Sequence, residues 1–193
     1  MGNYAGNAGV FLIQTLFGMY LVAVMLRFLL QLTRADFYNP VSQFLVKVTN
    51  PPLIPLRRLI PGFIGIDMAA VVLLVAIQAL ELVLVGLVQG FSLSIPGLLV
   101  LTVAGLINLV LDVYFFTIII QVILSWVNPG GYNPAIALLY TLNEPILSRA
   151  RRLIPPISGF DLSPIVVFIL IQLLKIVFVS PIGDLGRRLA FGT

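Results

Sequence analysis

Four uninterrupted apolar stretches restrict the fold of this chain more than any other feature of its sequence. They lie at residues 10–32, 68–88, 97–127 and 165–179, and the last reaches spanning length when it is counted as 162–180. A bilayer core of ~30 Å needs about 20 helical residues. The stretches are continuously apolar and do not alternate, so they predict helices and not barrel strands. We therefore expect an all-α membrane protein with four transmembrane helices.

The composition agrees with that expectation and removes several kinds of chemistry. Hydrophobic residues make up 60% of the chain and charged residues 9%, whereas soluble domains carry roughly 25% charged residues. The sequence contains no cysteine and no histidine. Disulfides, thiolate metal sites and histidine-based catalysis are therefore excluded.

The chain repeats itself at a spacing of 94 residues. Arg-Arg-Leu-Ile-Pro begins at Arg57 and again at Arg151. Residues 20–84 align with 114–178 without a gap, and about 20 of roughly 65 positions are identical. The matched motif residues are Tyr38, Asn39, Pro40, Pro51, Pro61 and Asp67 in the first copy, and Tyr132, Asn133, Pro134, Pro145, Pro155 and Asp161 in the second.

Each copy reads as helix, connector and helix. The expected segments are a first repeat at 1–90 (helix 10–32, connector 33–66, helix 67–89), a second at 97–182 (helix 97–127, connector 128–160, helix 162–180) and a tail at 183–193. Because each repeat crosses the membrane twice, both enter from the same side. The repeats are therefore expected to be parallel, related by an axis along the membrane normal.

Basic residues predict which side the connectors face. The two connectors carry seven of them: Arg34, Lys47, Arg57, Arg58, Arg149, Arg151 and Arg152. The N-terminal segment and the turn at 89–96 carry none, and the tail carries Arg187 and Arg188. Basic loops stay on the cytoplasmic side, so we expect cytoplasmic connectors and periplasmic termini in a bacterial inner membrane.

The connectors themselves show an amphipathic pattern. Pro40 and Pro51 bracket a segment in which Val41, Phe44 and Leu45 begin an apolar face, and the second copy keeps apolar residues at the matching positions. A second short segment follows and ends at the arginine pair. These segments are too short to span the bilayer, so we expect two short helices lying in the interface in each connector.

The arginine pairs have two interpretations, and the sequence leaves both open. Arginines at the cytoplasmic boundary lock the orientation and reach the lipid phosphates. The alternative is a site for phosphate or carboxylate that Arg57, Arg58, Arg151 and Arg152 form together across the pseudo-twofold axis, binding an anionic lipid or a protein partner.

Charged side chains inside the apolar stretches are the second candidate site. Arg27 lies close to the end of its helix, where it is expected to snorkel to the interface. Glu81, Asp112 and Lys175 lie deeper, in one layer, and Glu81 and Lys175 are equivalent positions of the two repeats. The amides Gln78, Gln172 and Asn108 extend the same faces. The layer is expected to be a structural ion pair or triad, a pathway for an ion or proton, or a partly lipid-facing set.

No motif of a catalytic site accompanies these residues. The serines lack an activating partner, and the glycines follow neither phosphate-binding nor dinucleotide-binding spacing. We expect a protein that is not an enzyme, with no cofactor and no metal. The expected partners are the lipid bilayer and its anionic lipids, a membrane or cytoplasmic protein, and further copies of the chain. Nucleic acid is not among them.

The connector motif resembles one family. "DFYNPVSQFLVKVTNPPLIPLRRLIP" followed by "GIDMAAVV", and "PILSRARRLIPPISGFDLSPIVV" in the second copy, are similar to the YggT family, also called YlmG, in its duplicated Gram-negative form. The second copy departs from the first in carrying Gly130 and Gly131 in place of Asp36 and Phe37.

The resemblance implies an uncleaved inner-membrane protein without catalysis. The family's roles include resistance to osmotic shock, ion homeostasis, cell division, nucleoid positioning and haem attachment to cytochrome b6. The leading expectation is therefore support of osmotic or ion homeostasis by conducting or modulating ion flux. The alternative is a membrane scaffold that binds anionic lipid or a partner protein in cell division or in cofactor and envelope assembly.

Overall fold

The computed structural model describes residues 4–127, 133–154 and 161–192, and its regular elements are helices. In chain order these are α1 (Tyr4–Leu32), α2 (Pro40–Leu59), α3 (Met68–Gln89), α4 (Ile95–Val127), α5 (Pro134–Leu153), α6 (Ser163–Leu174), the π-helix η1 (Lys175–Val179) and α7 (Ser180–Phe191). The all-α architecture is the one that the hydropathy pattern predicts.

Four helices are long and apolar enough to cross a membrane. They are α1, α3, α4 and the continuous helix Ser163–Phe191 formed by α6, η1 and α7. Large apolar side chains such as Phe11, Leu16 and Ile169 are more than half exposed on them, which is the surface that lipid chains cover. The chain is therefore a multi-pass membrane protein.

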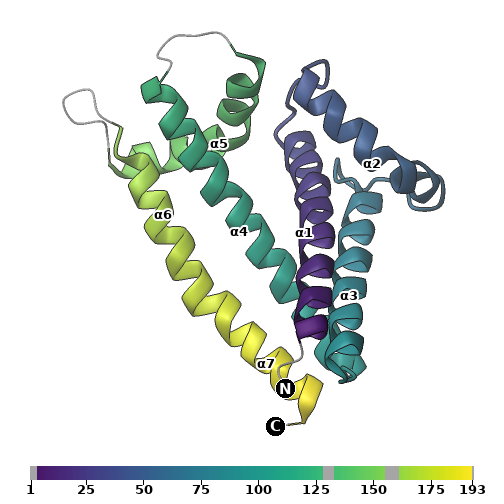
Figure 1. Cartoon of the computed structure of the whole chain (residues 1–193). Helices are drawn as coiled ribbons and strands as arrows, with labels where there is room; N and C mark the ends of the chain where they lie inside the picture. Colours follow the sequence, from purple (N-terminus) through teal and green to yellow (C-terminus); the bar gives the residue numbers. More distant parts are fainter. Residues whose placement is uncertain (1–3, 128–132, 155–160, 193) are drawn as a thin grey trace.

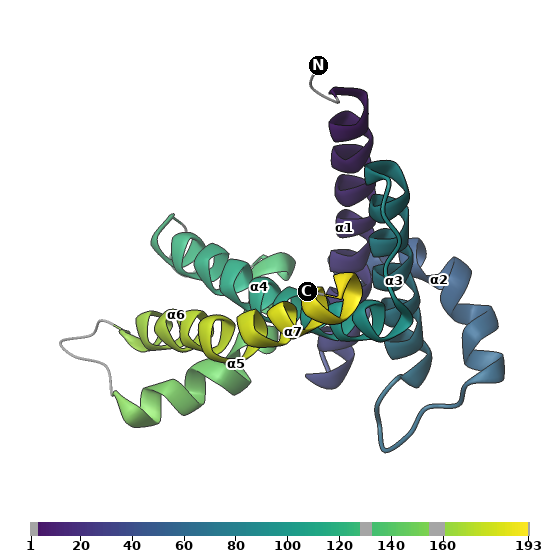
Figure 2. The same ribbon diagram turned by 90° about the horizontal axis from the view of Figure 1, so that it is seen from below.

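The two repeats stand side by side in the same direction. Figure 1 shows α2 and α5 at one end of the molecule and both chain termini at the other. Seen from below, in Figure 2, α1 pairs with α3 in one arm, and α4 lies along the helix of α6 and α7 in the other. This is the parallel arrangement expected from two crossings per repeat.

Each connector folds as one helix of 20 residues, which corrects the expectation of two short segments. Asn39 and Asn133 cap the helices by accepting hydrogen bonds from Val41 N and Ala135 N, and proline follows at the first helical position. The helices end at Ile60 and Ile154, because an isoleucine followed by proline favours extended backbone.

Helix α2 continues through Pro51, Pro52 and Pro55 because its packing face does not change there. Leu45, Thr49 and Leu53 are spaced four residues apart on both sides of the first two prolines, and all three are buried. A proline removes its own backbone hydrogen bond and crowds one carbonyl of the preceding turn. Burial of this stripe against the spanning helices offsets that cost.

The segment 183–193, expected as a C-terminal tail, is helical as far as Phe191. Helix α7 packs on the beginning of α4 through small residues: Gly97 meets the backbone of Ala190, and a Cβ on Gly186 would lie 2.8 Å from Leu101 Cδ2. Ser94 Oγ also donates a hydrogen bond of 2.6 Å to the carbonyl of Leu189. Small residues let spanning helices approach closely, so α7 closes the terminal end of the second repeat.

Candidate functional site

A polar contact joins the first spanning helix of each repeat to its connector helix. In the first repeat Arg27 Nη1 donates to Thr49 Oγ1 at 2.6 Å and to the carbonyl of Val46 at 3.4 Å. Arg27 is only 5% exposed, so the expectation that it snorkels is wrong: α2 lies over its side chain and removes the path to the interface. Its Nε atom has no hydrogen-bond partner among the described residues.

The same contact recurs 94 residues later with different side chains. Gln121 replaces Arg27 and Asn143 replaces Thr49, and Asn143 Nδ2 donates to Gln121 Oε1 at 2.8 Å. Thr117 Oγ1 donates to Asn143 Oδ1, also at 2.8 Å. We call these contacts the two clasps. Thr49, Gln121 and Asn143 are absent from the sequence-predicted site, although one signal for them existed: polar residues at matched repeat positions within apolar faces.

Each repeat holds a pocket beside its clasp, where the connector helix ends. The first-repeat pocket is about 390 Å³ and is lined by Gln31, Arg57, Ile60, Gly62, Gly65, Ile66 and Asp67. The second-repeat pocket is about 600 Å³ and includes the equivalents Ser125, Arg151 and Asp161, together with Gln121, Trp126 and Tyr140. The two pockets therefore share three equivalent lining positions.

In the first-repeat pocket one carboxylate holds the arginine. Arg57 Nε donates to Asp67 Oδ2 at 3.0 Å, and its Nη2 also bonds to that oxygen. The other oxygen, Oδ1, caps α3 by accepting from Ala70 N at 3.2 Å. Asp67 is buried, with 6% of its side chain exposed, whereas 38% of the Arg57 side chain is exposed. Asp67 therefore does two things: it caps the beginning of α3, and it holds the side chain of Arg57 in place.

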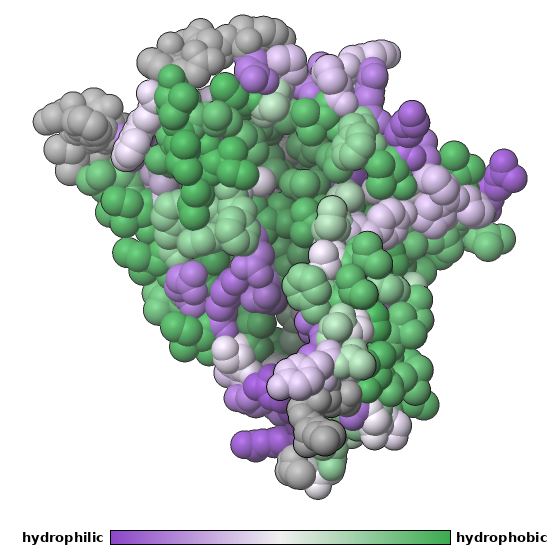
Figure 3. Space-filling model, in the orientation of Figure 1, coloured by the Kyte–Doolittle hydropathy of each residue, from purple (hydrophilic) through white to green (hydrophobic). Residues whose placement is uncertain are grey.

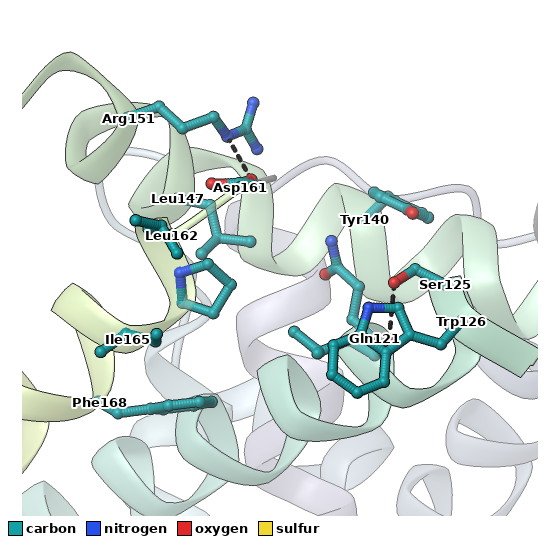
Figure 4. Close-up of a pocket in the computed structure, with 12 residues that line it drawn as sticks. Gln121, Ser125, Trp126, Tyr140, Leu147, Arg151, Asp161, Leu162, Ile165 and Phe168 are labelled. Atoms are coloured by element: carbon teal, nitrogen blue, oxygen red, sulfur yellow. Dashed lines mark hydrogen bonds and ion pairs between the residues drawn. The ribbon is translucent and has the colours of Figure 1, made fainter. Parts of the chain in front are cut away.

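The second-repeat pocket adds a second carboxylate. Arg151 donates to both oxygens of Glu144, at 3.0 Å and 2.7 Å, and its Nε lies 3.2 Å from Asp161 Oδ2. Figure 4 shows Arg151 and Asp161 on one side of the pocket, with Tyr140, Trp126 and Gln121 on another. The hydrogen bonds to Glu144 raise the pKa of Arg151 further above its ordinary value. Asp161 Oδ1 accepts a hydrogen bond of 2.8 Å from Ser163 N at the beginning of α6, where Leu162 is the N-cap residue.

A strained turn lines the first-repeat pocket. Phe63 and Ile66 pair through two backbone hydrogen bonds, at 3.0 Å and 2.9 Å, and between them Ile64 and Gly65 have φ angles of 50° and 79°. Gly65 tolerates such an angle, but a β-branched residue there is an outlier that costs about 1–3 kcal/mol. Ile64 is 83% exposed, so no packing of its side chain explains the conformation.

The arginine pairs do not form one joint site, which corrects that expectation. Asn39 Nδ2 of the first repeat donates to the carbonyl of Pro134 at 2.7 Å, and this contact joins the beginnings of α2 and α5. From there the helices diverge, and their C-terminal ends point away from each other in Figures 1 and 2. Arg58 and Arg152 are exposed at those separate ends.

The intramembrane layer is organised around one ion pair. Lys175 of η1 pairs with Asp112 Oδ1 of α4, and Asn108 Nδ2 donates to Asp112 Oδ2 at 2.7 Å. Figure 3 shows a hydrophilic patch in the apolar surface where α4 and the helix of α6 and η1 lie together. Both oxygens of Asp112 are therefore engaged within the second repeat.

Glu81 does not pair with Lys175, although the two occupy equivalent positions of the repeats. Glu81 Oε2 accepts a hydrogen bond of 3.1 Å from Gln78, and among the described residues it has no ion pair. Lys175 begins a π-helix, which changes the helical rotation from that point, whereas Glu81 lies in regular α-helix. Gln172, the equivalent of Gln78, is exposed on α6.

The remaining motif residues have structural positions. Tyr38 and Pro61 are exposed, Pro40 and Pro134 begin α2 and α5, and Pro51 and Pro145 lie inside them. Tyr132 and Pro155 lie outside the described residues. Within the described part of the chain, no group of three or more acidic, histidine or cysteine side chains is placed to hold a metal ion.

Comparison with known proteins agrees with this duplicated architecture. The family model CCB3/YggT matches the chain twice, at residues 6–88 and 100–182. An uncharacterized protein of Pseudomonas aeruginosa is 46% identical over 176 residues, which cover 90% of this chain and 89% of that protein. The uncharacterized protein YggT of Escherichia coli is 33% identical over 190 residues, 96% of this chain and 97% of its own length.

A chloroplast relative matches one repeat. The Arabidopsis thaliana protein CCB3, whose name describes it as a cofactor assembly protein of complex C, is 34% identical over 90 residues, 46% of this chain and 51% of its own length. No solved structure matches the chain. The two matches to the family model coincide with the two helix, connector and helix units, and the chain belongs to the CCB3/YggT family of membrane proteins.

Proposed function

We propose that this protein is a non-enzymatic scaffold of the bacterial inner membrane, on which α2 and α5 form a platform for a protein partner in membrane or cofactor assembly. The observation that carries the proposal is the double attachment of these helices. The clasps fasten each one to a spanning helix, and the Asn39 to Pro134 contact fastens them to each other. A rigid and largely exposed pair of helices is suited to holding a partner in place.

The surface of the platform has the composition of a binding face. Phe44, Ile54 and Tyr140 are 63%, 47% and 45% exposed, and Arg58 and Arg152 are exposed at the ends. Aromatic side chains and arginine are enriched in protein interfaces. The name of the Arabidopsis relative, a cofactor assembly protein, agrees with such a role.

The proposal places the platform in the cytoplasm. Support comes from the basic residues, since the connectors hold seven and the terminal end holds Arg187 and Arg188, of which Arg187 is paired with Asp184. The chain contains no cysteine, so a single introduced cysteine shows directly on which side of the membrane its position lies. Lys47→Cys should react with an impermeant thiol reagent only after the cytoplasmic side is opened, and Gln89→Cys should react from outside. The reverse pattern contradicts the orientation.

The scaffold role is tested by replacing the arginines at the ends of both connector helices. A variant with Arg57, Arg58, Arg151 and Arg152 replaced by Gln should insert normally but fail to complement a bacterial strain that lacks its own family member. Lys47→Gln is the matched control, because it removes a connector charge away from both pockets. The proposal is wrong if the fourfold variant inserts correctly and keeps all its lipid and protein associations.

A second function, support of osmotic or ion homeostasis, rests on Glu81. Its carboxyl group lies inside a spanning helix, and it accepts a hydrogen bond from the amide of Gln78 instead of pairing with a cation of the described residues. Ionisable residues inside membranes are costly and often mark ion or proton pathways. Against this interpretation, the ion pair of Lys175 with Asp112 satisfies the other charges of the layer.

The two functions respond to different variants. Glu81→Ala, which leaves the ion pair of Lys175 and Asp112 in place, should lower survival of osmotic shock if the layer moves ions, and should leave complementation by the platform intact. No flux in liposomes together with unchanged survival would remove the second function.

A further inference from the structure

We propose that the first-repeat pocket binds the phosphate group of an anionic phospholipid, and that the second-repeat pocket does not. This inference rests on the proposed function, since it assigns a ligand to one end of the platform. The two pockets share the equivalent positions of Arg57 and Asp67 but have different charged neighbours, and that difference supplies matched controls.

The copies have opposite charge. In the first repeat two guanidinium groups, Arg27 and Arg57, stand against the single carboxylate of Asp67, and the three interact electrostatically. In the second repeat Arg151 stands against two carboxylates, Glu144 and Asp161, because the position of Arg27 is occupied by Gln121. Each pocket is itself lined by one arginine and one aspartate, so the difference comes from the neighbouring charge: Arg27 beside the first-repeat pocket makes the group net positive, and Glu144 beside the second makes it net negative.

The copies also differ in free hydrogen-bond donors. Arg57 uses Nε and Nη2 on one oxygen of Asp67, and within the described residues its Nη1 has no partner. Arg151 uses both terminal nitrogens on Glu144. Of the five N–H donors of a guanidinium, Arg57 therefore keeps more for a phosphate oxygen than Arg151 does, and one whole terminal nitrogen of Arg57 is unused.

A buried side chain reinforces the positive field of the first-repeat pocket. Arg27 is 5% exposed, and its Nε is buried without a partner among the described residues. Gln31, one turn further along α1, lines the pocket and adds an amide. The charge of Arg27 lies behind the pocket where solvent screens it little, so it strengthens the attraction felt at Arg57.

The surroundings favour a lipid over free phosphate. Phe63 and Ile64 on the strained turn are 64% and 83% exposed, and Leu59 at the end of α2 is 79% exposed. Exposed apolar side chains beside a basic pocket are typical of surfaces that enter the lipid interface. The pocket also lies where the connector helix α2 leads to the beginning of the spanning helix α3.

One position of the repeat decides whether the pocket arginine is paired with a second carboxylate. Asn50 of α2 is the equivalent of Glu144, and both precede the pocket arginine by seven residues, or about two helical turns. Asn50→Glu should place a carboxylate against Arg57, so that this arginine no longer binds an anion. Glu144→Asn should free Arg151 from its carboxylate partner, so that the second-repeat pocket becomes able to bind one.

Tryptophan fluorescence reads each pocket separately. The single tryptophan, Trp126, lines the second-repeat pocket, and its equivalent in the first repeat is Leu32, the residue after the pocket residue Gln31. Full-length protein is placed in phosphatidylcholine vesicles that contain phosphatidylglycerol, and either lipid carries brominated chains that quench nearby tryptophan. The native chain reports the second-repeat pocket. Trp126→Phe combined with Leu32→Trp reports the first.

The expected result is a preference at one pocket only. The Leu32→Trp reporter should show about five-fold enrichment of phosphatidylglycerol, the ratio given by roughly 1 kcal/mol of attraction per basic residue. Asn50→Glu should abolish this preference, and the neutral control Asn50→Gln should keep it. Trp126 in the native chain should show no preference until Glu144→Asn is introduced.

Other outcomes overturn the proposal. Equal preference at both pockets would show that the surface charge of the platform, and not the pocket, attracts the lipid. Loss of the preference on addition of millimolar inorganic phosphate would assign the site to free phosphate. No preference at Leu32→Trp in a chain that still complements a deletion strain would reject the lipid site and leave the scaffold function standing.

Discussion

Arg27 on α1 and Thr49 on α2 are joined by a buried hydrogen bond of 2.6 Å, and Gln121 and Asn143 make the corresponding bond of 2.8 Å in the second repeat. The bond is kept while both partners change. Each clasp fastens an interfacial helix to a spanning helix, so the position of the platform depends on it.

Removing one partner of the first clasp should destabilise the protein. Thr49→Ala leaves the buried guanidinium of Arg27 without its closest hydrogen bond, which costs about 1–3 kcal/mol in the free energy of unfolding. Thermal unfolding in detergent measures the effect. Thr141→Ala on α5 is the control, because that threonine is exposed and should change little. Equal stability of the two variants would show that the clasp does not hold α2.

The intramembrane ion pair should show strong coupling. Lys175→Met leaves Asp112 without its cation in an apolar environment and should lower stability by on the order of 3 kcal/mol. Lys175→Met combined with Asp112→Asn should recover most of that loss. Glu81→Gln should have a small effect, since Glu81 has only the amide of Gln78 beside it among the described residues. Additive losses in the double variant would contradict the pairing.

The packing of α7 on α4 should not tolerate a larger residue. Gly186→Val would place its side chain on Leu101, and overpacking of this kind costs about 1–3 kcal/mol. Gly18→Ala on α1 meets nothing within 4 Å and should be neutral or slightly stabilising. Loss of melting temperature in the first variant alone is the expected result. An unaffected Gly186→Val protein would mean that α7 is a free tail.

Relief of backbone strain should stabilise the turn beside the first-repeat pocket. Ile64 has a φ of 50°, which asparagine adopts more readily than a β-branched residue. Ile64→Asn should therefore raise the free energy of unfolding by about 1 kcal/mol. Phe63→Asn, outside the strained angle, should give no gain. If the turn serves lipid binding, the more stable Ile64→Asn protein should also lose part of its preference for phosphatidylglycerol.

The spanning helices and their duplication are predictable because each depends on a pattern that extends over many residues. Hydropathy locates a helix of about 20 residues without knowledge of its neighbours. The repeat locates the connectors in the same way. Asp112 and Lys175 are charged residues within apolar stretches, so the sequence also indicates that each of them pairs with another group. Their actual pairing within the second repeat is beyond the sequence, since it depends on helix rotation and on the π-helix at Lys175.

The predictions that the structure corrects share a physical cause. Each depends on which other element packs against a residue, and the sequence around that residue does not show this. Depth counted along one helix places Arg27 at the interface, but α2 covers it. The prolines of α2 indicate a break, but the stripe of Leu45, Thr49 and Leu53 continues through them. Hydropathy ends the last spanning helix at residue 180, but the helix continues to Phe191, where Gly97 of α4 and Gly186 of α7 allow close packing.

Ion flux through purified protein in liposomes tests the scaffold account most directly. The charges of the layer are paired or hydrogen-bonded within the described structure, so the account predicts flux no greater than in liposomes without protein, across the common monovalent ions and over a range of salt concentration. Flux that depends on the protein and disappears in Glu81→Gln or Lys175→Met would contradict it, and would identify the layer as a conducting path.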